Sequence, residues 1–227
     1  MQKKIIGVYG CSGFGREVIP LVSDQADEVS NHGSSTKIYF VDDNPPSEII
    51  NGYQVLSWEK FSGLEGDKKV VIAIASSIAR RSLHSKISRS SVNVFGVRAQ
   101  NVVTYDHVQI GEGCIICSGC ILTSNISVGR CFHANLNSYV AHDCIIGDYV
   151  TFAPCVKCNG NVIIEDDVYV GTGSIIKQGK PGRPLVIGKG AKIEAGSYVT
   201  KSVSPGETVF GSPARKMSLA NLRSFAK

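Results

Sequence analysis

The feature that most constrains this chain is an apolar residue that recurs every six positions. Twelve consecutive positions in this register are apolar: Ile110, Ile116, Leu122, Val128, Ala134, Val140, Ile146, Phe152, Cys158, Ile164, Val170 and Ile176. A period of six fits neither a helix of 3.6 residues per turn nor a simple alternating strand. It predicts a solenoid of short strands and tight corners. Three hexapeptides would close one triangular coil, so that residues eighteen apart stack on one another.

A second set of positions, four residues after each member of the first, is mostly small or β-branched. It comprises Cys114, Cys120, Ile126, Phe132, Ser138, Cys144, Val150, Val156, Val162, Val168 and Ser174. We expect both sets to point into the solenoid. The residue directly after the aliphatic one is often glycine, as at Gly111, Gly129, Gly147 and Gly171. We assign glycine and asparagine to the corners, because they tolerate dihedral angles that other residues resist.

The cysteines admit two interpretations. Cys114, Cys117 and Cys120 are spaced by three, and Cys155-x-x-Cys158 resembles half of a zinc site. Alternatively, the cysteines are small buried apolar residues in a reducing compartment. Since inward repeat positions account for Cys114, Cys120, Cys144 and Cys158, we favour the second interpretation. We therefore expect no bound metal and no essential disulfide.

The register breaks once. After Ile176 the pattern resumes at Ile187, followed by Ile193 and Val199, which is five residues later than the period requires. The additional residues predict a Gly- and Pro-rich loop over 177–184. Such a loop is either a ligand contact or a tolerated surface insertion. The tail from Pro205 to Lys227 includes a short helical stretch, and we expect it to cap the open end of the solenoid.

Residues 1–97 follow a different pattern. Strands are expected at Lys4–Tyr9, Ile38–Val41 and Val70–Ile74, alternating with helical segments. This order is typical of a parallel sheet built from βαβ units. The predicted fold is therefore an α/β Rossmann-like domain over 1–97, followed by an all-β left-handed parallel β-helix, a hexapeptide-repeat solenoid, over 98–227.

Several residues of the first domain are candidate ligand contacts. A glycine-rich turn, Gly10–Gly15, follows the first strand, and such a turn at a helix N-terminus attracts phosphate. The carboxyl ends of parallel strands share one edge of the sheet, where ligands bind. The expected contacts are Ser12, Gly13, Phe14, Gly15, Asp42, Asp43, Ser76 and Arg80. Because the domain holds only one mononucleotide-binding half, a nucleoside diphosphate is favoured over NAD. The alternative is a degenerate domain that only supports an oligomer.

The amino-acid composition narrows the classes of molecule that the chain is expected to bind. The 24 basic and 19 acidic residues give a net charge of +5, and the basic residues are spread along the chain. A nucleic-acid-binding protein would gather them into a stripe. No apolar stretch approaches the length of a membrane span, and the N-terminus lacks the pattern of a signal peptide. These features predict a cytoplasmic protein that binds small molecules.

In its combination of motifs the chain resembles the amino-sugar acetyltransferases of the sialic acid O-acetyltransferase and UDP-N-acetylbacillosamine N-acetyltransferase family. The resemblance covers nearly the whole length. Its markers are Gly10-x-Ser12-Gly13-x-Gly15, Phe40-Val41-Asp42-Asp43, Ile72-Ala73-Ile74, Asn135, His142-Asp143-Cys144-x-Ile146-Gly147, Lys157-Cys158-Asn159-Gly160-Asn161-Val162 and Gly211-Ser212-Pro213-Ala214-Arg215.

The resemblance implies a homotrimer that serves polysaccharide biosynthesis, with each active site between neighbouring β-helices. Acetyl-CoA would lie along the groove between two subunits, and a sugar nucleotide would reach in from the N-terminal domain. His142 matches the family's catalytic base, Asp143 its acidic neighbour and Asn135 a residue that lines the pocket. The expected cofactor contacts are Thr151, Gly160, Gly171 and Lys177.

The implied chemistry is consistent with these residues. The C4 amine of a dideoxy sugar must lose a proton as it attacks the thioester, and a histidine can accept that proton near neutral pH. The adjacent carboxylate would orient the imidazole. Backbone N–H groups near Gly160 would stabilise the oxyanion. Many relatives carry a second histidine where this chain has Thr151, whose hydroxyl cannot titrate. The remaining histidines, His32, His84, His107 and His133, are expected outside the catalytic role.

Two rival functions stay open. The same base could serve O-acetylation of a sialic acid or a related sugar. Alternatively, the chain is a non-catalytic scaffold that binds sugar nucleotides. The His142-Asp143 pair argues against a scaffold, and the glycine loop with Asp42 argues for a nucleotide-linked acceptor. We favour N-acetylation of a UDP- or dTDP-linked 4-amino-dideoxy sugar.

Overall fold

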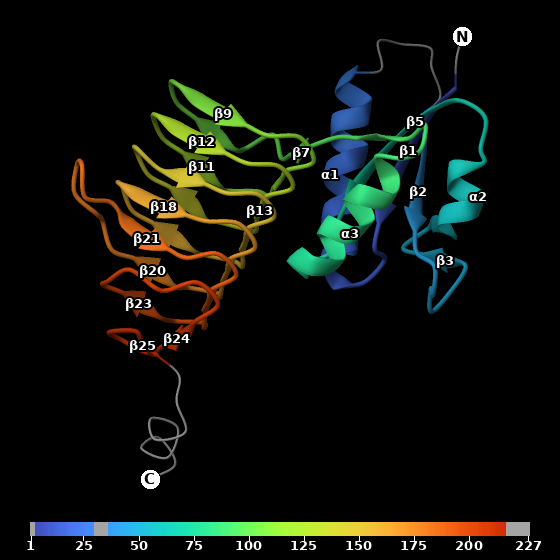
Figure 1. Cartoon of the computed structure of the whole chain (residues 1–227). Coiled ribbons are helices and arrows are strands. Elements are labelled where there is room, and N and C mark those ends of the chain that lie inside the picture. Colours follow the sequence, from blue (N-terminus) through green and yellow to red (C-terminus); the bar gives the residue numbers. More distant parts are fainter. Residues whose placement is uncertain (1–2, 30–35, 217–227) are drawn as a thin grey trace. The chain divides into compact units, whose positions relative to one another are not determined.

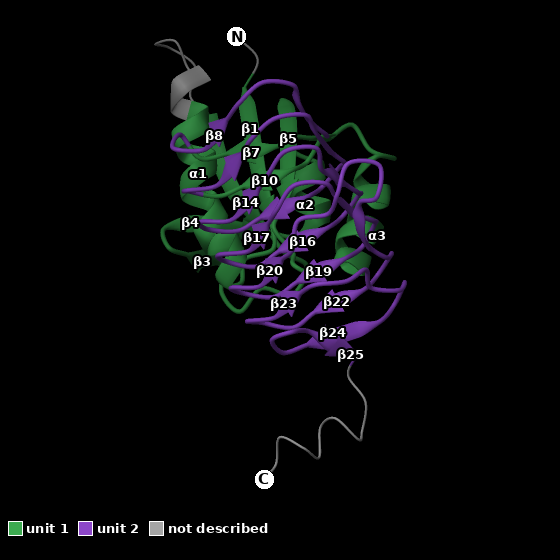
Figure 2. Ribbon diagram, turned by 90° about the vertical axis from the view of Figure 1, so that its left-hand side faces the viewer, with its two compact units in different colours: residues 1–99, 112–117 green, residues 100–111, 118–227 purple. Residues whose placement is uncertain are grey.

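The computed structural model describes residues 3–29 and 36–216. The chain divides into two compact units, coloured separately in Figure 2. Unit 1 comprises residues 1–99 and 112–117, and unit 2 comprises residues 100–111 and 118–227. The expected fold class is confirmed: an α/β unit precedes a solenoid of stacked parallel strands. The segment Glu112–Cys117 groups with unit 1, and the division into functional domains near residue 97 stays a prediction.

The core of unit 1 is a sheet with the strand order β3-β4-β2-β1-β5-β6. All of its pairings are parallel except that of β3 with β4. The strands are β1 (Lys4–Tyr9), β2 (Thr36–Val41), β3 (Ile49–Ile50), β4 (Tyr53–Leu56), β5 (Asp67–Ile72) and β6 (Asn93–Val94). Unit 1 also contains the parallel pair β7 (Val97–Arg98) and β10 (Ile115–Ile116).

Among the described residues of unit 1, three helices cover this sheet: α1 (Gly13–Val29), α2 (Trp58–Ser62) and α3 (Ser77–Ile87). Successive strand residues point to opposite faces, so Val8 and Tyr9 of β1 enter different cores. Val8 packs in the cluster that contains Ile19 of α1. Tyr9 packs in the cluster that contains Phe61 of α2 and Ile87 of α3. The helices therefore lie on both faces, and the carboxyl ends of β1, β2, β4 and β5 share one edge.

Unit 2 is a triangular solenoid whose coils are stacked in Figure 1. The first face has the strand order β21 (Leu185–Ile187), β18 (Val162–Ile164), β15 (Ile145–Ile146), β12 (Ile126–Val128), β9 (Val108–Ile110). The second face has the order β23 (Tyr198–Val199), β20 (Ile175–Ile176), β17 (Lys157–Cys158), β14 (Tyr139–Val140), β11 (Ile121–Leu122), β8 (Val103–Thr104). The third face has, within unit 2, the order β25 (Arg215–Lys216), β24 (Thr208–Phe210), β22 (Lys192–Ile193), β19 (Tyr169–Val170), β16 (Thr151–Phe152), β13 (His133–Ala134).

Strand register confirms the stacking interval. Ile146 pairs with Ile164, eighteen residues later. After the insertion the interval becomes twenty-three, as in the pairing of Ile164 with Ile187. The five additional residues therefore leave the coils in register, because they enter between β20 and β21 rather than within a strand.

The expected inward positions are buried, with one exception. Members of both apolar sets from Cys114 to Ile176 are less than 9% exposed, and Ile187, Ile193 and Val199 are also buried. Ile110 was expected to point inward as well, but it is 39% exposed. It belongs to β9, the terminal strand of the first face, so it lacks a neighbouring coil on one side.

The corners are built differently from the prediction. A residue with positive φ recurs every six positions along unit 2 and its border with unit 1: His107, Gly113, Gly119, Asn125, Cys131, Asn137, Asp143, Tyr149, Cys155, Asn161, Asp167 and Gly173. This left-handed residue lies three positions after the aliphatic one, not directly after it. Non-glycine residues in this region carry a steric cost of about 1–2 kcal/mol, which asparagine bears better than most.

The glycines that were assigned to the corners have a different role. A Cβ atom on Gly111 would lie 2.7 Å from the carbonyl carbon of Gly129, and one on Gly129 would lie 2.7 Å from that of Gly147. These glycines therefore allow successive coils to approach closely, and the prediction that they supply corner dihedrals is wrong.

All eight cysteines are free thiols. Cys155 is exposed and the other seven are buried, as expected for Cys114, Cys120, Cys144 and Cys158. None of the helices among residues 3–29 and 36–216 has the length and apolar character to cross a membrane. The described tail ends with the antiparallel pair β24–β25. The predicted helical stretch after Lys216 lies outside the described residues, and so does His32.

Candidate functional site

His142 and Asp143 form a dyad at the corner between the second and first faces of the solenoid, just after β14. His142 Nδ1 lies 2.7 Å from Asp143 Oδ2. Both side chains are about half exposed, at 48% and 47%. Because Nδ1 is engaged by the carboxylate, Nε2 is the nitrogen left to exchange a proton with a ligand. The corner therefore presents an oriented imidazole to solvent.

The dyad is held by residues from the coils on either side of it. Asn125 Nδ2 donates a hydrogen bond of 3.2 Å to Asp143 Oδ1. On the other side, a Cβ atom on Gly160 would lie 2.5–2.9 Å from three atoms of the His142 ring. The imidazole thus lies directly against the backbone of Gly160, and any side chain there would displace it. Asn125 was missed by the sequence analysis, although it lies eighteen residues before Asp143.

The electrostatics of the dyad favour an ionised carboxylate. The hydrogen bonds from His142 and then Asn125 hold the pKa of Asp143 below its ordinary value. A carboxylate that stays charged can fix the imidazole orientation and stabilise the imidazolium that forms when the ring takes up a proton. The pair can therefore act as a general base that is aligned before a substrate arrives.

A hydrogen-bonded pair of polar side chains lies beside this corner. Tyr139 Oη of β14 donates to Asn159 Oδ1 at 2.8 Å, and Asn159 Nδ2 donates to the carbonyl of Ile176 at 2.8 Å. Partial burial raises the pKa of Tyr139. The contact fixes the segment that leads from β17 into Gly160.

Other expected contacts lie elsewhere on the solenoid. Asn135 and Gly171 follow β13 and β19, so they lie at the corner between the third and second faces. Thr151 belongs to β16 of the third face, where it pairs with His133 and is 6% exposed. Lys177 follows β20 and shares the corner of His142. One chain therefore places His142, Asp143 and Gly160 together, with Lys177 farther along the same corner, two coils beyond His142. Asn135, Thr151 and Gly171 lie elsewhere on the solenoid.

The glycine-rich turn of unit 1 has the geometry expected of it. Gly10 has a φ of 101°, and α1 begins at Gly13. A Cβ atom on Gly15 would overlap the carbonyl oxygen of Gly10, so only glycine fits there. Ser12 and Gly13 are exposed, while Phe14 is half-buried. The exposed start of a helix of this length is a suitable place for phosphate oxygens.

Asp42 lies at the carboxyl end of β2 and faces this turn. Its Oδ2 accepts hydrogen bonds from the backbone N–H of Cys11 at 3.3 Å and from the Cys11 thiol at 3.2 Å. Its Oδ1 accepts from the backbone N–H of Asn44 at 3.0 Å. Burial and the hydrogen bond to Asp42 raise the pKa of Cys11 to about 11, so this thiol stays protonated at neutral pH.

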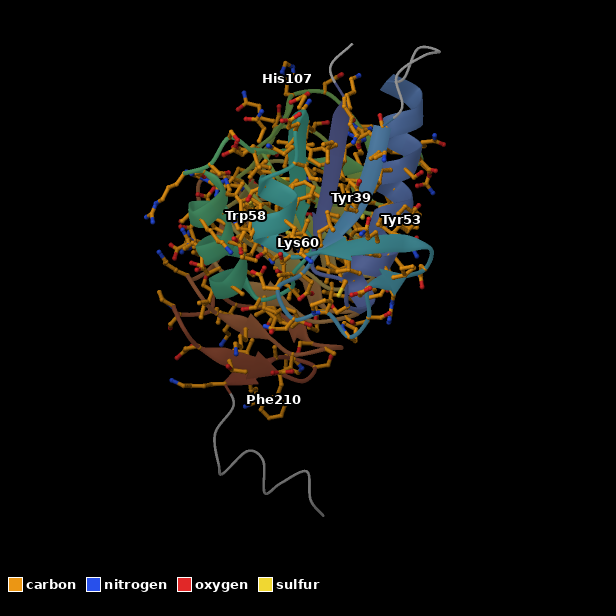
Figure 3. The ribbon with its side chains drawn as sticks, turned by 90° about the vertical axis from the view of Figure 1, so that its right-hand side faces the viewer. Tyr39, Tyr53, Trp58, Lys60, His107 and Phe210 are labelled. Atoms are coloured by element: carbon orange, nitrogen blue, oxygen red, sulfur yellow. The ribbon has the colours of Figure 1, made fainter. Side chains whose placement is uncertain are left out.

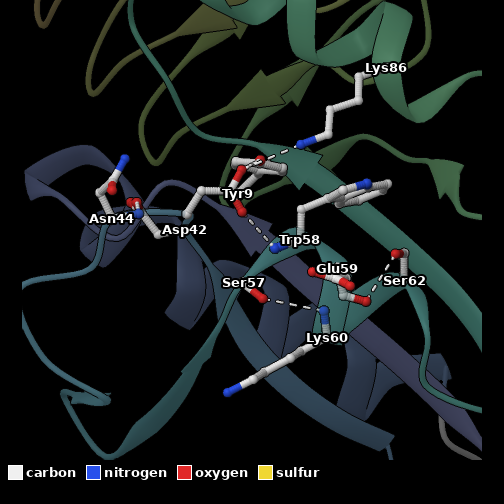
Figure 4. A network of polar contacts seen from close by, with 10 residues as sticks. Tyr9, Asp42, Asn44, Ser57, Trp58, Glu59, Lys60, Ser62 and Lys86 are labelled. Carbon is white, nitrogen blue, oxygen red and sulfur yellow. Dashed lines mark hydrogen bonds and ion pairs between the residues drawn. The ribbon is translucent and has the colours of Figure 1, made fainter.

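Asp43 is surrounded by protein donors, of which Tyr9, Trp58 and Lys86 are labelled in Figure 4. The backbone N–H of Trp58 donates to Oδ1 at 2.8 Å, and Tyr9 Oη donates to Oδ2 at 2.8 Å. Lys86 Nζ lies 3.4 Å from Oδ2 and 5.5 Å from the centre of the Trp58 ring. Partial burial would raise the pKa of Asp43, but the Trp58 and Tyr9 hydrogen bonds and the Lys86 charge together lower it.

The aromatic neighbours of Asp43 were not anticipated. The Trp58 ring stacks on Tyr9 with a centroid distance of 5.9 Å. Trp58 and Lys60 of α2 and Tyr53 of β4 are labelled on the strand-and-helix unit in Figure 3. Asp43 thus anchors the start of α2, and both of its oxygens already have partners.

The two residues expected after β5 have structural roles. Ser76 caps α3, because its hydroxyl accepts from the backbone N–H of Ala79 at 3.4 Å. Arg80 is fully buried, and its guanidinium donates to the carbonyls of Ile74 and Ala75 at 2.7 and 3.1 Å. The predicted substrate contact of Arg80 is therefore corrected: the side chain holds the loop at the sheet edge instead of facing solvent.

The other described histidines lie away from the dyad. His133 is 1% exposed on β13 of the third face. His84 is buried in α3, with Nε2 3.4 Å from Glu112 Oε1. His107, labelled in Figure 3, is a left-handed corner residue before β9.

Comparison with protein families matches both parts of the chain. Residues 5–87 match the family described as the PglD N-terminal domain. Residues 94–124 and 161–201 match the family described as the hexapeptide repeat of succinyl-transferase.

Comparison with individual proteins matches nearly the whole chain. It is 46% identical, over 94% of its length and 96% of the relative, to GDP-perosamine N-acetyltransferase of Escherichia coli O157:H7. Among solved structures, WeeI from Acinetobacter baumannii AYE is 51% identical with a TM-score of 0.89, covering 95% of this chain and all of that one. The acetyltransferase domain of PglB from Neisseria gonorrhoeae FA1090, in complex with acetyl coenzyme A, shares the fold at 21% identity, with a TM-score of 0.83 and coverage of 95% and 100%.

Proposed function

Because this chain belongs to the hexapeptide-repeat N-acetyltransferases of nucleotide-linked amino sugars, we propose that it moves the acetyl group of acetyl-CoA to the 4-amino group of a dideoxy sugar. The chain is an acyltransferase by this membership. The observation that carries the proposal is the half-exposed His142–Asp143 dyad, oriented for proton transfer at a solenoid corner.

The nucleotide of the acceptor is the next part of the proposal. The sequence alone favoured UDP or dTDP. The full-length relative at 46% identity is named for GDP-perosamine, an amino sugar linked to GDP. We therefore make GDP-perosamine the first acceptor to test. In the proposal, the glycine-rich turn and Asp42 of unit 1 bind the nucleotide, since the exposed helix start accommodates phosphate.

In the proposed reaction the neutral sugar amine attacks the carbonyl carbon of the thioester. The new C–N bond forms as the amine gives up its proton to His142 Nε2, and Asp143 stabilises the resulting imidazolium. The C–S bond then breaks, and the CoA thiolate leaves and takes up a proton from the imidazolium. General-base help of this kind typically contributes about 10²–10⁴-fold in rate. No covalent enzyme intermediate is required, so the buried thiols need no chemical role.

Our proposal includes a homotrimer. The expected cofactor and substrate contacts on the solenoid fall into two groups at two different corners, one with His142, Gly160 and Lys177 and one with Asn135 and Gly171. A single site can contain both groups only if a corner of one copy faces the other corner of a second copy. Light scattering should therefore report three copies per particle. A monomer with full activity would remove the reason for a shared site.

We also place the reaction in the cytoplasm, as a step of polysaccharide biosynthesis. Support comes from the eight free cysteines, which are typical of a reducing compartment.

The decisive experiment mixes the purified protein with acetyl-CoA and GDP-perosamine and detects the acetylated sugar nucleotide by mass. Product mass is a better readout than thiol release, because Cys155 is exposed and would react with thiol reagents. The same assay with UDP- and dTDP-linked amino sugars fixes the nucleotide, and an assay with sialic acid tests O-acetylation. Binding of the sugar nucleotide without turnover of any acceptor would favour the scaffold alternative and contradict the proposal.

A further inference from the structure

The insertion between β20 and β21 forms one wall of an open pocket on unit 2. Lys180 and Arg183 exchange backbone hydrogen bonds of 3.1 and 2.9 Å around Pro181 and Gly182, so the insertion folds back as a tight hairpin. The opposite wall is the segment Thr200–Ser202, which follows β23. Ser202 Oγ accepts a hydrogen bond from the N–H of Val186 at 3.0 Å and ties the two walls together. We call this the loop pocket.

The loop pocket is strongly basic. Lys177, Lys180, Arg183 and Lys201 all line it, all are exposed, and the pocket lining contains no Asp or Glu. Among the residues that the structure describes, none of these four side chains has an ion-pair partner within 4.0 Å. Other cations of the same unit are paired, as in Arg130–Asp148 at 2.9 Å and Lys216–Glu207 at 2.7 Å. Uncompensated charges of one sign that line a hollow raise the local concentration of ligands of the opposite sign.

The loop pocket lies on the same corner as the dyad. Gly179 N–H donates to the carbonyl of Gly160 at 2.9 Å, and Gly160 lies against the His142 ring. Gly160 belongs to the coil after that of His142, and Gly179 belongs to the coil after that. Neighbouring strands in a sheet are about 4.8 Å apart, so the loop lies two strand spacings along the corner from the backbone of His142. A ligand that has its reacting group at His142 can therefore extend along the corner to the loop.

We propose that the loop pocket binds the phosphate groups of CoA, above all its 3′-phosphate. This inference rests on the proposed function, which requires two phosphorylated substrates. The sugar nucleotide has its phosphate site at the glycine-rich turn of unit 1, which leaves CoA for the solenoid corner. A phosphate monoester carries a charge between about −1.5 and −2 at neutral pH. Lys and Arg side chains are the residues that bind such groups through charge-assisted hydrogen bonds.

The test compares the wild type with a Lys180→Ala/Arg183→Ala double variant. Both side chains are exposed and the hairpin is closed by backbone atoms, so the variant should fold, and its thermal unfolding should match the wild type. The matched control is Lys192→Ala, which removes an exposed lysine from β22 on another face. Each protein is assayed with acetyl-CoA, 3′-dephospho-acetyl-CoA and acetyl-pantetheine, and binding of free CoA is measured by calorimetry without an acceptor.

The double variant should raise the KM for acetyl-CoA about tenfold, which corresponds to about 1.4 kcal/mol. Its KM for 3′-dephospho-acetyl-CoA should change much less, and its KM for the sugar nucleotide should not change. Wild-type affinity for CoA should weaken with added salt more steeply than that of the variant, because salt screens exposed charges.

Three results would overturn the inference while leaving the proposed function intact. The variant could bind CoA as tightly as the wild type, it could lose the same factor with all three acyl donors, or its KM could rise for the sugar nucleotide instead. Failure of the wild type to bind CoA at all would overturn the proposed function as well.

Discussion

The two units assemble their polar clusters in different ways. In the solenoid, the groups that hold the dyad are found by counting: Asn125 lies eighteen residues before Asp143, and Gly160 lies eighteen residues after His142. In the α/β unit, the donors to Asp43 are separated from it by 34, 15 and 43 residues. They come from β1, α2 and α3. Proximity thus follows sequence spacing in one unit and depends on convergence of strand ends in the other.

The largest expected effect tests whether the general base of the reaction lies in the solenoid. Replacing His142 by Ala should lower kcat by about 10²–10⁴-fold, the usual loss for a general base. The KM for acetyl-CoA should change far less. Wild-type kcat/KM should rise with pH along a limb that vanishes in the variant, because a general base must be unprotonated to act.

The variant profile must be measured with the same acceptor, because a titrating sugar amine can produce a similar limb. If His142→Ala keeps more than about a tenth of the wild-type kcat, the base lies elsewhere. His133 would then be the next residue to replace.

The second effect tests whether the α/β unit serves binding. Asp42→Ala removes a carboxylate at the edge of the sheet and should raise the KM for the sugar nucleotide by the equivalent of about 1–3 kcal/mol. The KM for acetyl-CoA should stay nearly unchanged. Asp24→Ala, which removes an exposed carboxylate from α1, is the matched control. If the KM for the sugar nucleotide is unchanged in the Asp42 variant, the α/β unit does not bind this substrate.

A smaller effect tests whether a residue eighteen positions before the dyad supports it, as the coil length implies. Asn125→Ala removes the hydrogen bond to Asp143 and should lower kcat about tenfold, since a hydrogen bond to a charged group is worth about 1.5–3 kcal/mol and this one is exposed. Asn137→Ala is a close control, because Asn137 has the same left-handed conformation, with a φ of 56° in both. Within the described part of the chain, Asn137 makes no hydrogen bond to His142 or Asp143. Equal losses in both variants would point to corner strain instead of dyad orientation.

The smallest effect concerns stability and pH. The folded-state pKa of Asp43 is depressed, so its charged contacts stabilise the fold above the unfolded pKa of about 4 and are lost as the pH falls through the lower folded value. Because the side chain is 46% exposed, the contribution should be under about 1 kcal/mol. Asp43→Asn should therefore unfold slightly more easily at pH 7, and the difference should shrink at pH 3. Urea titrations at both pH values provide the measurement, and a difference that grows toward pH 3 would contradict this account.

Much of the solenoid was predictable because its period maps position in sequence onto position in space. The inward residues, the stacking interval and the place of the insertion all follow from the hexads. The end of the repeat was harder: Ile110 obeys the pattern but lacks a neighbouring coil, so it stays exposed. Glycines in the repeat were misassigned because sequence alone does not distinguish a glycine needed for positive φ from one needed for close approach.

The α/β unit was predictable only in outline. Strand ends and the glycine turn could be located, but the directions of side chains at the edge could not. Arg80 was taken for a ligand contact because an arginine after a strand end often is one, yet it turns inward to the Ile74 and Ala75 carbonyls. No sequence pattern marked Trp58 as a neighbour of Asp43, since a lone tryptophan in a short helix is expected to be a core residue. Its position depends on Asp43, fifteen residues away.

The insertion at residues 177–184 separates two properties of a chain that usually change together, its length and its register. Ile187, Ile193 and Val199 are as deeply buried as Ile176, although five residues have been added between them. A corner can therefore lengthen without moving any strand that follows it. Descendants of one solenoid could exchange the residues of a single corner, and with them any ligand that this corner binds, while the imidazole two coils away keeps its surroundings unaltered.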